Sequence, residues 1–231
     1  MTSIAANLQA VRERIGAACL AAGRSKDSVH LLAVSKTWPA ASLREAAATG
    51  QLAFGENYVQ EAIDKIAALA DPALEWHFIG PLQSNKTRPV AENFAWVHSV
   101  DRLKIAERLS AQRPSHLPPL KLCLQVNVSG EASKSGCVPA EAPGLAAAIA
   151  LLPGVTLKGL MAIPEPTDDV AVQRSRFALL RETMDAINAV RAGGLDTLSM
   201  GMSDDLEAAI MEGATIVRIG TAIFGQREYE K

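Results

Sequence analysis

Short apolar runs alternate with amphipathic stretches along almost the whole chain. The apolar runs are rich in Leu, Ile, Val and Phe and have the length of buried strands. Between them, apolar residues recur every three or four positions, which is typical of helices that cover a sheet. An amphipathic helix from about Ile4 to Ala18, ended by Gly23, precedes the first apolar run.

The pattern predicts eight strands, each followed by a helix or a helical turn. The predicted strands are residues 31–34, 51–54, 76–79, 95–98, 120–128, 156–163, 197–200 and 215–219. The predicted helices are residues 39–48, 59–70, 83–92, 101–112, 140–151, 170–192, 204–211 and 221–224. Asp101 is the expected N-cap of the fourth of these helices.

Strands that alternate with helices indicate parallel βαβ units. The 231 residues lie within the size range of barrels built from eight such units, roughly 200 to 250 residues. We therefore predict a single (β/α)8 TIM-type barrel with an additional N-terminal helix, as one domain over residues 1–231. An open, doubly wound sheet is the alternative if one strand is miscounted.

The first predicted strand ends abruptly on Lys36, in the sequence AVSKTWP. Side chains alternate along a strand, so Leu32, Val34 and Lys36 share one face and the Lys36 amine points into the mouth of a barrel. An amine that apolar neighbours partly desolvate loses proton affinity and can condense with a carbonyl group. A solvated lysine at the end of a strand is the alternative.

Composition and charge narrow the class of protein. The formal net charge is −2 and the pI is about 6.1, so the basic face of a nucleic-acid-binding protein is not expected. The three cysteines have no metal-like spacing and indicate reduced thiols. The longest apolar run, residues 145–152, is too short to span a membrane, and no leader segment is evident. We expect a cytoplasmic protein.

Polar residues gather at the predicted carboxyl ends of the strands, where the chemistry of a barrel collects. Asn57 either binds a ligand or caps the helix that follows it. His77 and His98 are either core or catalytic histidines, and we find no carboxylate at a spacing that would pair with either. Other polar or unusual residues at such ends are Ser99, Asn127, Met161 and Ser199.

Two turns rich in small residues follow the last two predicted strands. Ser199, Gly201 and Ser203 lie in the first turn, and Gly220 and Thr221 in the second. Loops at this place in a barrel commonly bind phosphate, because their N–H and hydroxyl groups are donors. Helix caps and tight turns are the simpler interpretation.

Arg218 lies within the otherwise apolar eighth strand, so its charge needs a partner. The partner is either a ligand or a carboxylate, such as Glu56 or Glu212. A lysine, a phosphate cradle and an arginine together suit an aldehyde that carries a phosphate. Pyridoxal 5'-phosphate (PLP) fits this description, with Lys36 forming a Schiff base.

The chain also resembles a known family along almost its whole length, the pyridoxal phosphate homeostasis proteins. These are single-barrel relatives of the N-terminal domain of alanine racemase. The motifs that carry the resemblance are AVSKTWP, FGENYVQE, WHFIGPLQSNK, HSVD, VNVSGEASKSG, GLMAIP, SMGMSDDLEAAI and VRIGTAIFG.

The resemblance implies a role for each matching residue. Lys36 would carry the cofactor, and Arg218 would lie near the pyridine nitrogen. Ser199, Gly220 and Thr221 would surround the phosphate, while Asn57 and Met200 would line the ring pocket. The family is described as a carrier or regulator of PLP in vitamin B6 homeostasis, without established turnover. We also expect apoenzymes that accept PLP as partners, and a monomer or weak dimer as the oligomeric state.

Two enzymatic functions remain as alternatives. The first is a PLP-dependent amino-acid racemase, although an arginine at the ring nitrogen weakens the ring as an electron sink. Racemases add a tyrosine from a second domain, and neither Tyr58 nor Tyr229 has an evident place across from Lys36. The second is an isomerase or aldolase that acts on a sugar phosphate through Lys36.

The sequence also leaves open the role of two further lysines. The polar loop over residues 128–139, with Lys134 and Ser135, is either a lid over the barrel mouth or an exposed surface loop. Lys134 and Lys65 are candidates for a second, weaker contact with PLP.

Overall fold

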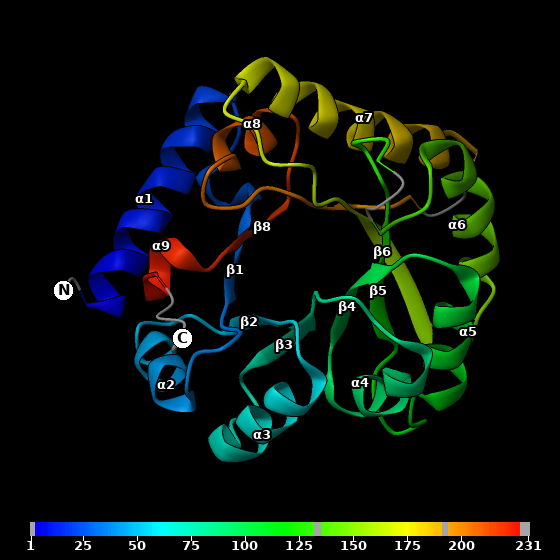
Figure 1. Ribbon diagram of the computed structural model, residues 1–231, viewed down its shortest axis with the longest axis horizontal. Helices are drawn as coiled ribbons and strands as arrows, with labels where there is room; N and C mark the ends of the chain where they lie inside the picture. The colour runs from blue at the N-terminus through cyan, green and yellow to red at the C-terminus, as the bar shows by residue number, and fades with distance from the viewer. Residues whose placement is uncertain (1–2, 132–134, 191–193, 227–231) are drawn as a thin grey trace.

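Eight parallel strands form a closed barrel in a computed structural model that describes residues 3–131, 135–190 and 194–226. Each strand pairs with the next along the chain, and β8 pairs with β1 to close the barrel (Figure 1). The strands are β1 (His30–Val34), β2 (Ala53–Glu56), β3 (Glu75–Phe78), β4 (Trp96–Val100), β5 (Leu120–Gln125), β6 (Val155–Met161), β7 (Thr197–Ser199) and β8 (Ile216–Ile219).

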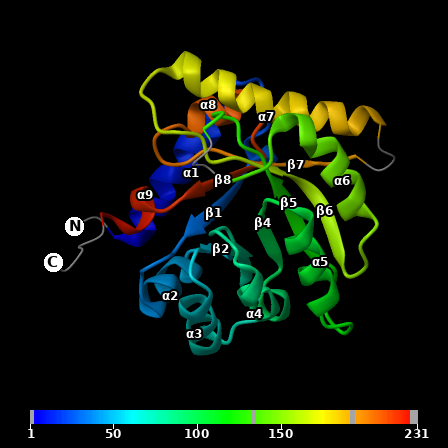
Figure 2. The same ribbon diagram turned by 45° about the vertical axis from the view of Figure 1, so that its right-hand side comes forward.

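Helices surround the barrel on its outer side (Figures 1 and 2). They are α1 (Ile4–Ala21), α2 (Ala40–Ala48), α3 (Val59–Leu69), α4 (Thr87–Asn93), α5 (Leu103–Gln112), α6 (Ala142–Ala150), α7 (Val170–Val190), α8 (Leu206–Met211) and α9 (Thr221–Phe224). Helix α1 precedes the barrel and packs against α8 and α9, which come from the other end of the chain. The predicted (β/α)8 barrel with an additional N-terminal helix is confirmed.

Apolar side chains form two separate layers, because successive residues of a strand point to opposite sides of the sheet. The larger layer lies between strands and helices and includes Phe54, Phe78 and Phe177, each fully buried. Two small clusters fill part of the barrel interior instead. Their members are Leu32, Val34, Ile79 and Ile216 in one, and Trp96, Cys123 and Met161 in the other.

The second strand begins two residues later than predicted, at Ala53 rather than at residue 51. Gln51 is buried, but its side-chain amide donates to the carbonyl oxygens of Leu31 and Ala53, at 3.0 and 2.8 Å. Gln51 therefore bonds to β1 and β2 through its side chain and does not pair as a residue of the strand.

Two predicted helix starts are wrong. The helix expected over residues 83–92 is a 3-10 turn, Ser84–Lys86, followed by α4, because Pro89 has no N–H and fits only the first turn of an α-helix. The N-cap of α5 is Arg102, without a side-chain cap bond, and not Asp101. The Asp101 carboxylate instead accepts both its bonds from the Arg102 guanidinium, at 2.8 Å.

No helix within the described part of the chain is long and apolar enough to cross a membrane.

Candidate functional site

A cavity of about 630 Å³ opens at the carboxyl ends of the strands. Five of the residues predicted for the site line it, namely Lys36, Asn57, Arg218, Gly220 and Thr221. The remaining lining residues are Arg14, Val34, Ile79, Ile163, Met202, Ser203, Asp204, Ala222 and Gln226. The cavity thus lies at the end of the barrel where parallel α/β barrels carry their chemistry.

Lys36 reaches this cavity for the reason that strand alternation predicts. Val34 belongs to the inner cluster of the barrel, and Lys36, two residues later, lines the cavity beside it. Thr37 then adopts a φ of 69°, a left-handed conformation that is rare for a β-branched residue. Its N–H donates to the Glu61 carboxylate at 2.5 Å. This bond to Glu61 of α3 stabilises the strained turn that follows Lys36.

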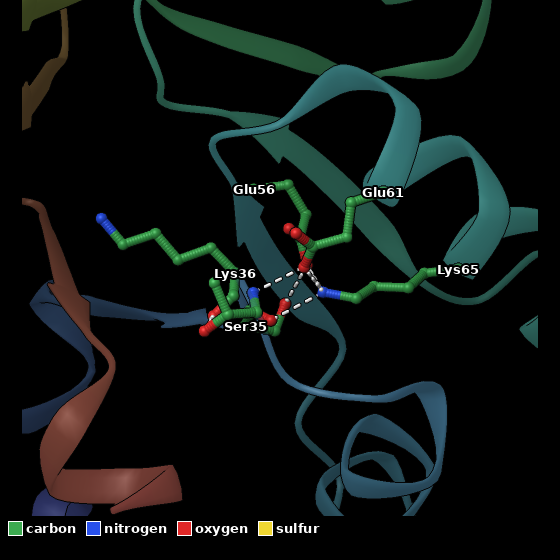
Figure 3. A network of polar contacts seen from close by, with 6 residues as sticks. Ser35, Lys36, Glu56, Glu61 and Lys65 are labelled. Carbon is green, nitrogen blue, oxygen red and sulfur yellow. Dashed lines mark hydrogen bonds and ion pairs between the residues drawn. The ribbon is translucent and has the colours of Figure 1, made fainter. Parts of the chain in front are cut away.

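A buried network of charged groups lies behind Lys36, and we call it the Lys65 network (Figure 3). The Lys65 ammonium lies 2.7 Å from a Glu56 oxygen and 2.5 Å from a Glu61 oxygen, and it donates to the Ser35 carbonyl at 2.7 Å. The Ser35 hydroxyl donates to the same Glu56 oxygen at 2.7 Å. The Lys36 side chain points away from these groups.

Burial dominates the electrostatics of the Lys65 network. It raises the pKa of Glu56, and the hydrogen bond from Lys65 opposes that rise. The second Glu56 oxygen has no hydrogen-bond partner among the described residues. Lys65 is only 6% exposed and does not line the cavity, so the structure does not bring it to the site as a second lysine. Ser135 is exposed, and Lys134 lies outside the described residues.

Arg218 is held by groups of the barrel interior. One terminal nitrogen donates to the carbonyl and the hydroxyl of Ser199, at 2.6 and 2.8 Å, and the other donates to the carbonyl of Ala162 at 2.8 Å. Burial lowers the pKa of Arg218 to about 10, and the negative charge of Asp205 opposes this shift. The guanidinium is almost fully buried but lines the cavity.

The alternative ion pairs of Arg218 are wrong. Glu56 pairs with Lys65, and Glu212 pairs with Arg174 and Arg181 on α7. A ligand in the cavity remains as the proposed partner of the Arg218 charge.

A chain of hydrogen bonds leads from Arg218 through the barrel interior. It passes from the Ser199 hydroxyl to His98 Nδ1 at 2.7 Å, and from His98 Nε2 to His77 Nδ1 at 3.0 Å. It ends at Glu75, whose carboxylate lies 2.9 Å from His77 Nε2. We call Arg218, Ser199, His98, His77 and Glu75 together the histidine chain.

The expectation that no carboxylate is spaced to pair with a histidine is wrong. Glu75 and His77 are two residues apart on β3, so they share the inner face of the strand. The sequence EWH carries this signal, because a spacing of two is the pairing distance along a strand. His98 has no such local signal, since its partner Ser199 is 101 positions away.

Asn57 does not cap α3, whose N-cap is Tyr58 without a side-chain cap bond. Its side-chain oxygen is buried, lacks a hydrogen-bond partner within the described chain, and belongs to a residue that lines the cavity. The Asn57 backbone packs so closely on Gly80 that a Cβ there would lie 2.4 Å from the Asn57 carbonyl oxygen. The loop after β3 therefore fixes the position of Asn57.

Two residues predicted for the site do not line the cavity. The Ser199 hydroxyl is buried between His98 and Arg218. Met200, the residue directly after β7, faces the other way and packs in the layer between the barrel and the helices. The structure thus brings Ser199 to Arg218 rather than to the cavity itself, and the roles predicted for both residues at the cofactor stay predictions.

The sequence analysis missed Arg14, which lines the cavity from helix α1. Its guanidinium pairs with both carboxylate oxygens of Glu207 and donates to the Ser203 carbonyl at 2.7 Å. Arg14 therefore ties the N-terminal helix to the loop after β7. The motif SMGMSDD contains Ser203, but nothing in the sequence near Arg14 connects it with that loop.

Two kinds of group are not found at the site within the described residues. No group of three or more His, Cys, Asp or Glu side chains could hold a metal ion. No described tyrosine lines the cavity, since Tyr58 is exposed elsewhere and Tyr229 lies outside the described residues.

Comparisons with known proteins agree on one relationship. The family model for the N-terminal domain of alanine racemase matches residues 1–228. A pyridoxal phosphate homeostasis protein from Pseudomonas aeruginosa is 66% identical over 229 residues, covering 99% of this chain and 98% of that protein. One of the same name from Escherichia coli is 55% identical over 236 residues, covering 100% of both.

A solved structure shares the whole barrel. The structure of PipY from Synechococcus elongatus with PLP bound superimposes with a TM-score of 0.83 at 41% identity, covering 96% of this chain and 100% of that one. The identity and coverage of these relatives leave no substantial part of the chain unmatched. The chain belongs to the family of the pyridoxal phosphate homeostasis proteins, which share the N-terminal domain of alanine racemase.

Proposed function

We propose that this protein binds PLP reversibly in the cavity at the carboxyl end of the barrel, as a Schiff base on Lys36. Its role is that of a carrier or regulator in PLP homeostasis, without catalytic turnover. The observation that carries the proposal is the convergence of the Lys36 amine, the Arg218 guanidinium and the turn at Thr221 on one cavity. The names of the relatives and the PLP bound to PipY support it.

The residues at the cavity fit PLP chemically. Asn57 offers a buried side-chain oxygen that lacks a partner among described residues. The first N–H groups of a helix have no partner within it, so Thr221 and Ala222 offer donors to a phosphate, beside the Thr221 hydroxyl. Three of the five N–H donors of Arg218 bond to Ser199 and Ala162, which leaves two for a ligand.

Each of these groups has a distinct role in the proposal. Lys36 supplies the amine, and Gly220 with Thr221 binds the phosphate. When bound, PLP supplies an aldehyde and a ring that withdraws electrons. Arg218 faces the ring nitrogen and disfavours its protonation, because a second positive charge would lie beside the first. This weakens the ring as an electron sink, which favours storage of the cofactor over racemisation.

The remaining parts of the proposal concern partners and place. Apoenzymes that need PLP are the acceptors, and the protein acts in the cytoplasm as a monomer or weak dimer. The three cysteines Cys19, Cys123 and Cys137 are free and buried, in keeping with a reducing compartment. Burial raises the pKa of Cys123 to about 12, so this thiol is unreactive.

Borohydride reduction and peptide mapping test the proposal. The purified protein with added PLP should be yellow, and reduction should fix the cofactor on the peptide that contains Lys36. The Lys36→Ala variant should lose that adduct, whereas Lys104→Ala, which removes an exposed lysine of α5, should keep it. A wild-type protein that stays colourless and unmodified would contradict the proposal.

Two activity measurements separate a carrier from an enzyme. Loaded protein mixed with an apoenzyme that requires PLP should restore the activity of that enzyme. The same loaded protein should not interconvert D- and L-alanine. Racemisation at an enzymatic rate would favour the alternative, a PLP-dependent amino-acid racemase.

A further inference from the structure

The histidine chain connects the two ends of the barrel. Glu75 begins β3 at the amino end and lines a second cavity, of about 770 Å³, together with His77. Arg218 lies near the carboxyl end of β8 and lines the PLP cavity. Four hydrogen bonds of 2.7 to 3.0 Å join them through Ser199 and His98.

Only one arrangement of protons satisfies every hydrogen bond of the histidine chain. An ionised carboxylate can only accept, so Glu75 requires a proton on His77 Nε2. A neutral imidazole carries one proton, so His77 Nδ1 accepts and His98 must carry its proton on Nε2. His98 Nδ1 then accepts the Ser199 hydroxyl proton, and the Ser199 lone pairs are left for Arg218.

The charges of these groups support that direction. The hydrogen bond from His77 lowers the pKa of Glu75 to about 2, so this carboxylate stays ionised. Burial lowers the pKa of His77 and lowers that of His98 well below its usual value, so both imidazoles stay neutral. The only charged groups of the histidine chain are therefore the Glu75 carboxylate at one end and the Arg218 guanidinium at the other.

We propose that Glu75 is a positioning residue for Arg218. Glu75 acts from the opposite end of the barrel, because it sets the tautomers of both histidines and the direction of the Ser199 hydroxyl. The inference rests on the proposed function in so far as Arg218 faces PLP. With the histidine chain in this direction, Ser199 accepts from Arg218 and holds the guanidinium at the wall of the cavity. With the direction reversed, His98 and Arg218 would both donate to the Ser199 oxygen, and the serine proton would need another acceptor.

The first test follows the histidine tautomers in protein free of PLP, by 15N NMR of selectively labelled histidine and arginine. The wild type should show both His77 and His98 protonated at Nε2. In Glu75→Met, which removes the acceptor but keeps much of the volume, we expect a mixture of tautomers and a shifted Arg218 resonance. Glu75→Gln keeps an acceptor oxygen and should retain the wild-type tautomers.

Lys121→Met is the matched control. Lys121 pairs with the other Glu75 oxygen at 3.2 Å, so its removal breaks an ion pair of Glu75 without touching the bond to His77. We expect the tautomers and the Arg218 resonance of this variant to match the wild type. Unchanged tautomers in Glu75→Met would overturn the proposal, and so would an Arg218 resonance that stays fixed while the tautomers change.

The second test measures the visible spectrum and the affinity of bound PLP in the same variants. Glu75→Met should shift the visible band of the PLP complex and weaken PLP binding about tenfold, as expected when a buried charged group loses a well-oriented hydrogen bond. Lys121→Met and Glu75→Gln should keep the wild-type band. An unshifted band and unchanged affinity in Glu75→Met would overturn the role of Glu75 toward PLP.

The two tests separate the inference from the proposed function. If wild-type protein forms no complex with PLP, the proposed function fails, and the NMR result still decides whether Glu75 positions Arg218. Thermal unfolding of each variant without PLP shows whether an effect is only a loss of stability. A structural role alone would lower the melting temperature without changing tautomers or the band.

Discussion

The two side chains that we propose bind PLP, Lys36 and Arg218, are supported in opposite ways. Behind Lys36 lies the Lys65 network, in which one ammonium meets two carboxylates within 2.7 Å. Behind Arg218 lies the histidine chain, in which neutral groups separate the guanidinium from a carboxylate at the far end of the barrel. The first is compact and ionic, and the second is long and neutral at its centre.

This difference indicates different roles. A buried ion pair strongly penalises the loss of either partner, so the Lys65 network fixes the backbone around Ser35 and Thr37. A chain of neutral donors and acceptors adds less to stability, but each member dictates the proton position of the next. We therefore expect substitutions in the Lys65 network to affect folding most, and substitutions in the histidine chain to affect the site most.

The largest expected effect is that of Lys65→Met. It leaves the Glu56 carboxylate buried without its cation, so the free energy of unfolding should fall by about 3–5 kcal/mol. Urea unfolding followed by circular dichroism measures this loss. The double variant Lys65→Met/Glu56→Gln should recover much of it, because the fully buried charge is removed and Glu61, the other partner of Lys65, is partly exposed to solvent. A loss below about 1 kcal/mol in the single variant would contradict an ionised, paired Glu56.

The pH dependence of this loss has a definite sign. Burial already raises the pKa of Glu56 in the folded state, and removal of Lys65 takes away the group that opposes the rise. The folded variant therefore holds a proton on Glu56 more tightly than the unfolded chain does, so its stability rises as the pH falls. The deficit relative to the wild type should shrink between neutral and acidic pH.

The comparison also shows what the sequence can predict. Strand alternation places Lys36 correctly, because it depends on residues two positions apart. The same rule, applied to EWH, would have paired Glu75 with His77. Local patterns thus suffice for elements and for contacts within one strand.

Contacts across the barrel cannot be predicted from such local patterns. His98 meets Ser199, and Arg14 meets the loop at Ser203, only because the sheet closes and α1 packs beside α8. Closure also decides that Met200 faces the helices, since its side depends on the register of β7 against β6 and β8. These placements follow from distant pairings that no short stretch of sequence encodes.

A smaller effect is expected for His98→Leu, which interrupts the histidine chain at its centre. His77 Nδ1 loses its donor and the Ser199 hydroxyl loses its acceptor, both in the buried interior. The free energy of unfolding should fall by about 2 kcal/mol. Met161→Leu, a change of similar volume in the same interior that removes no hydrogen bond of the histidine chain, should cost less than about 1.5 kcal/mol.

A double-mutant cycle sharpens this result. Ser199→Ala removes the hydroxyl that His98→Leu leaves without an acceptor, so the two losses should not add. We expect the double variant to be more stable than the sum of the two single losses by about 1 kcal/mol. Additive losses would mean that the bond between His98 and Ser199 does not contribute to stability.

The smallest expected effect is the acid titration of Glu75, and it has the opposite sign to that of Glu56. The pKa of Glu75 falls from 4.5 to about 2 on folding, because His77 donates to its carboxylate. A lowered pKa stabilises the folded state above the unfolded value, and this contribution is lost as the pH falls from about 5 toward 2. Since Glu75 is half-exposed, solvent limits the contribution to about 1 kcal/mol.

Urea unfolding of wild type and Glu75→Gln at a series of pH values isolates this contribution. The amide cannot titrate, so the difference in the free energy of unfolding between the two proteins should shrink by about 1 kcal/mol between pH ~6 and ~3. Lys121→Met should retain most of this dependence, because the bond from His77 is the larger cause of the lowered pKa. If the difference stays constant with pH, Glu75 is not held ionised by His77, and the histidine chain has no fixed acceptor at its end.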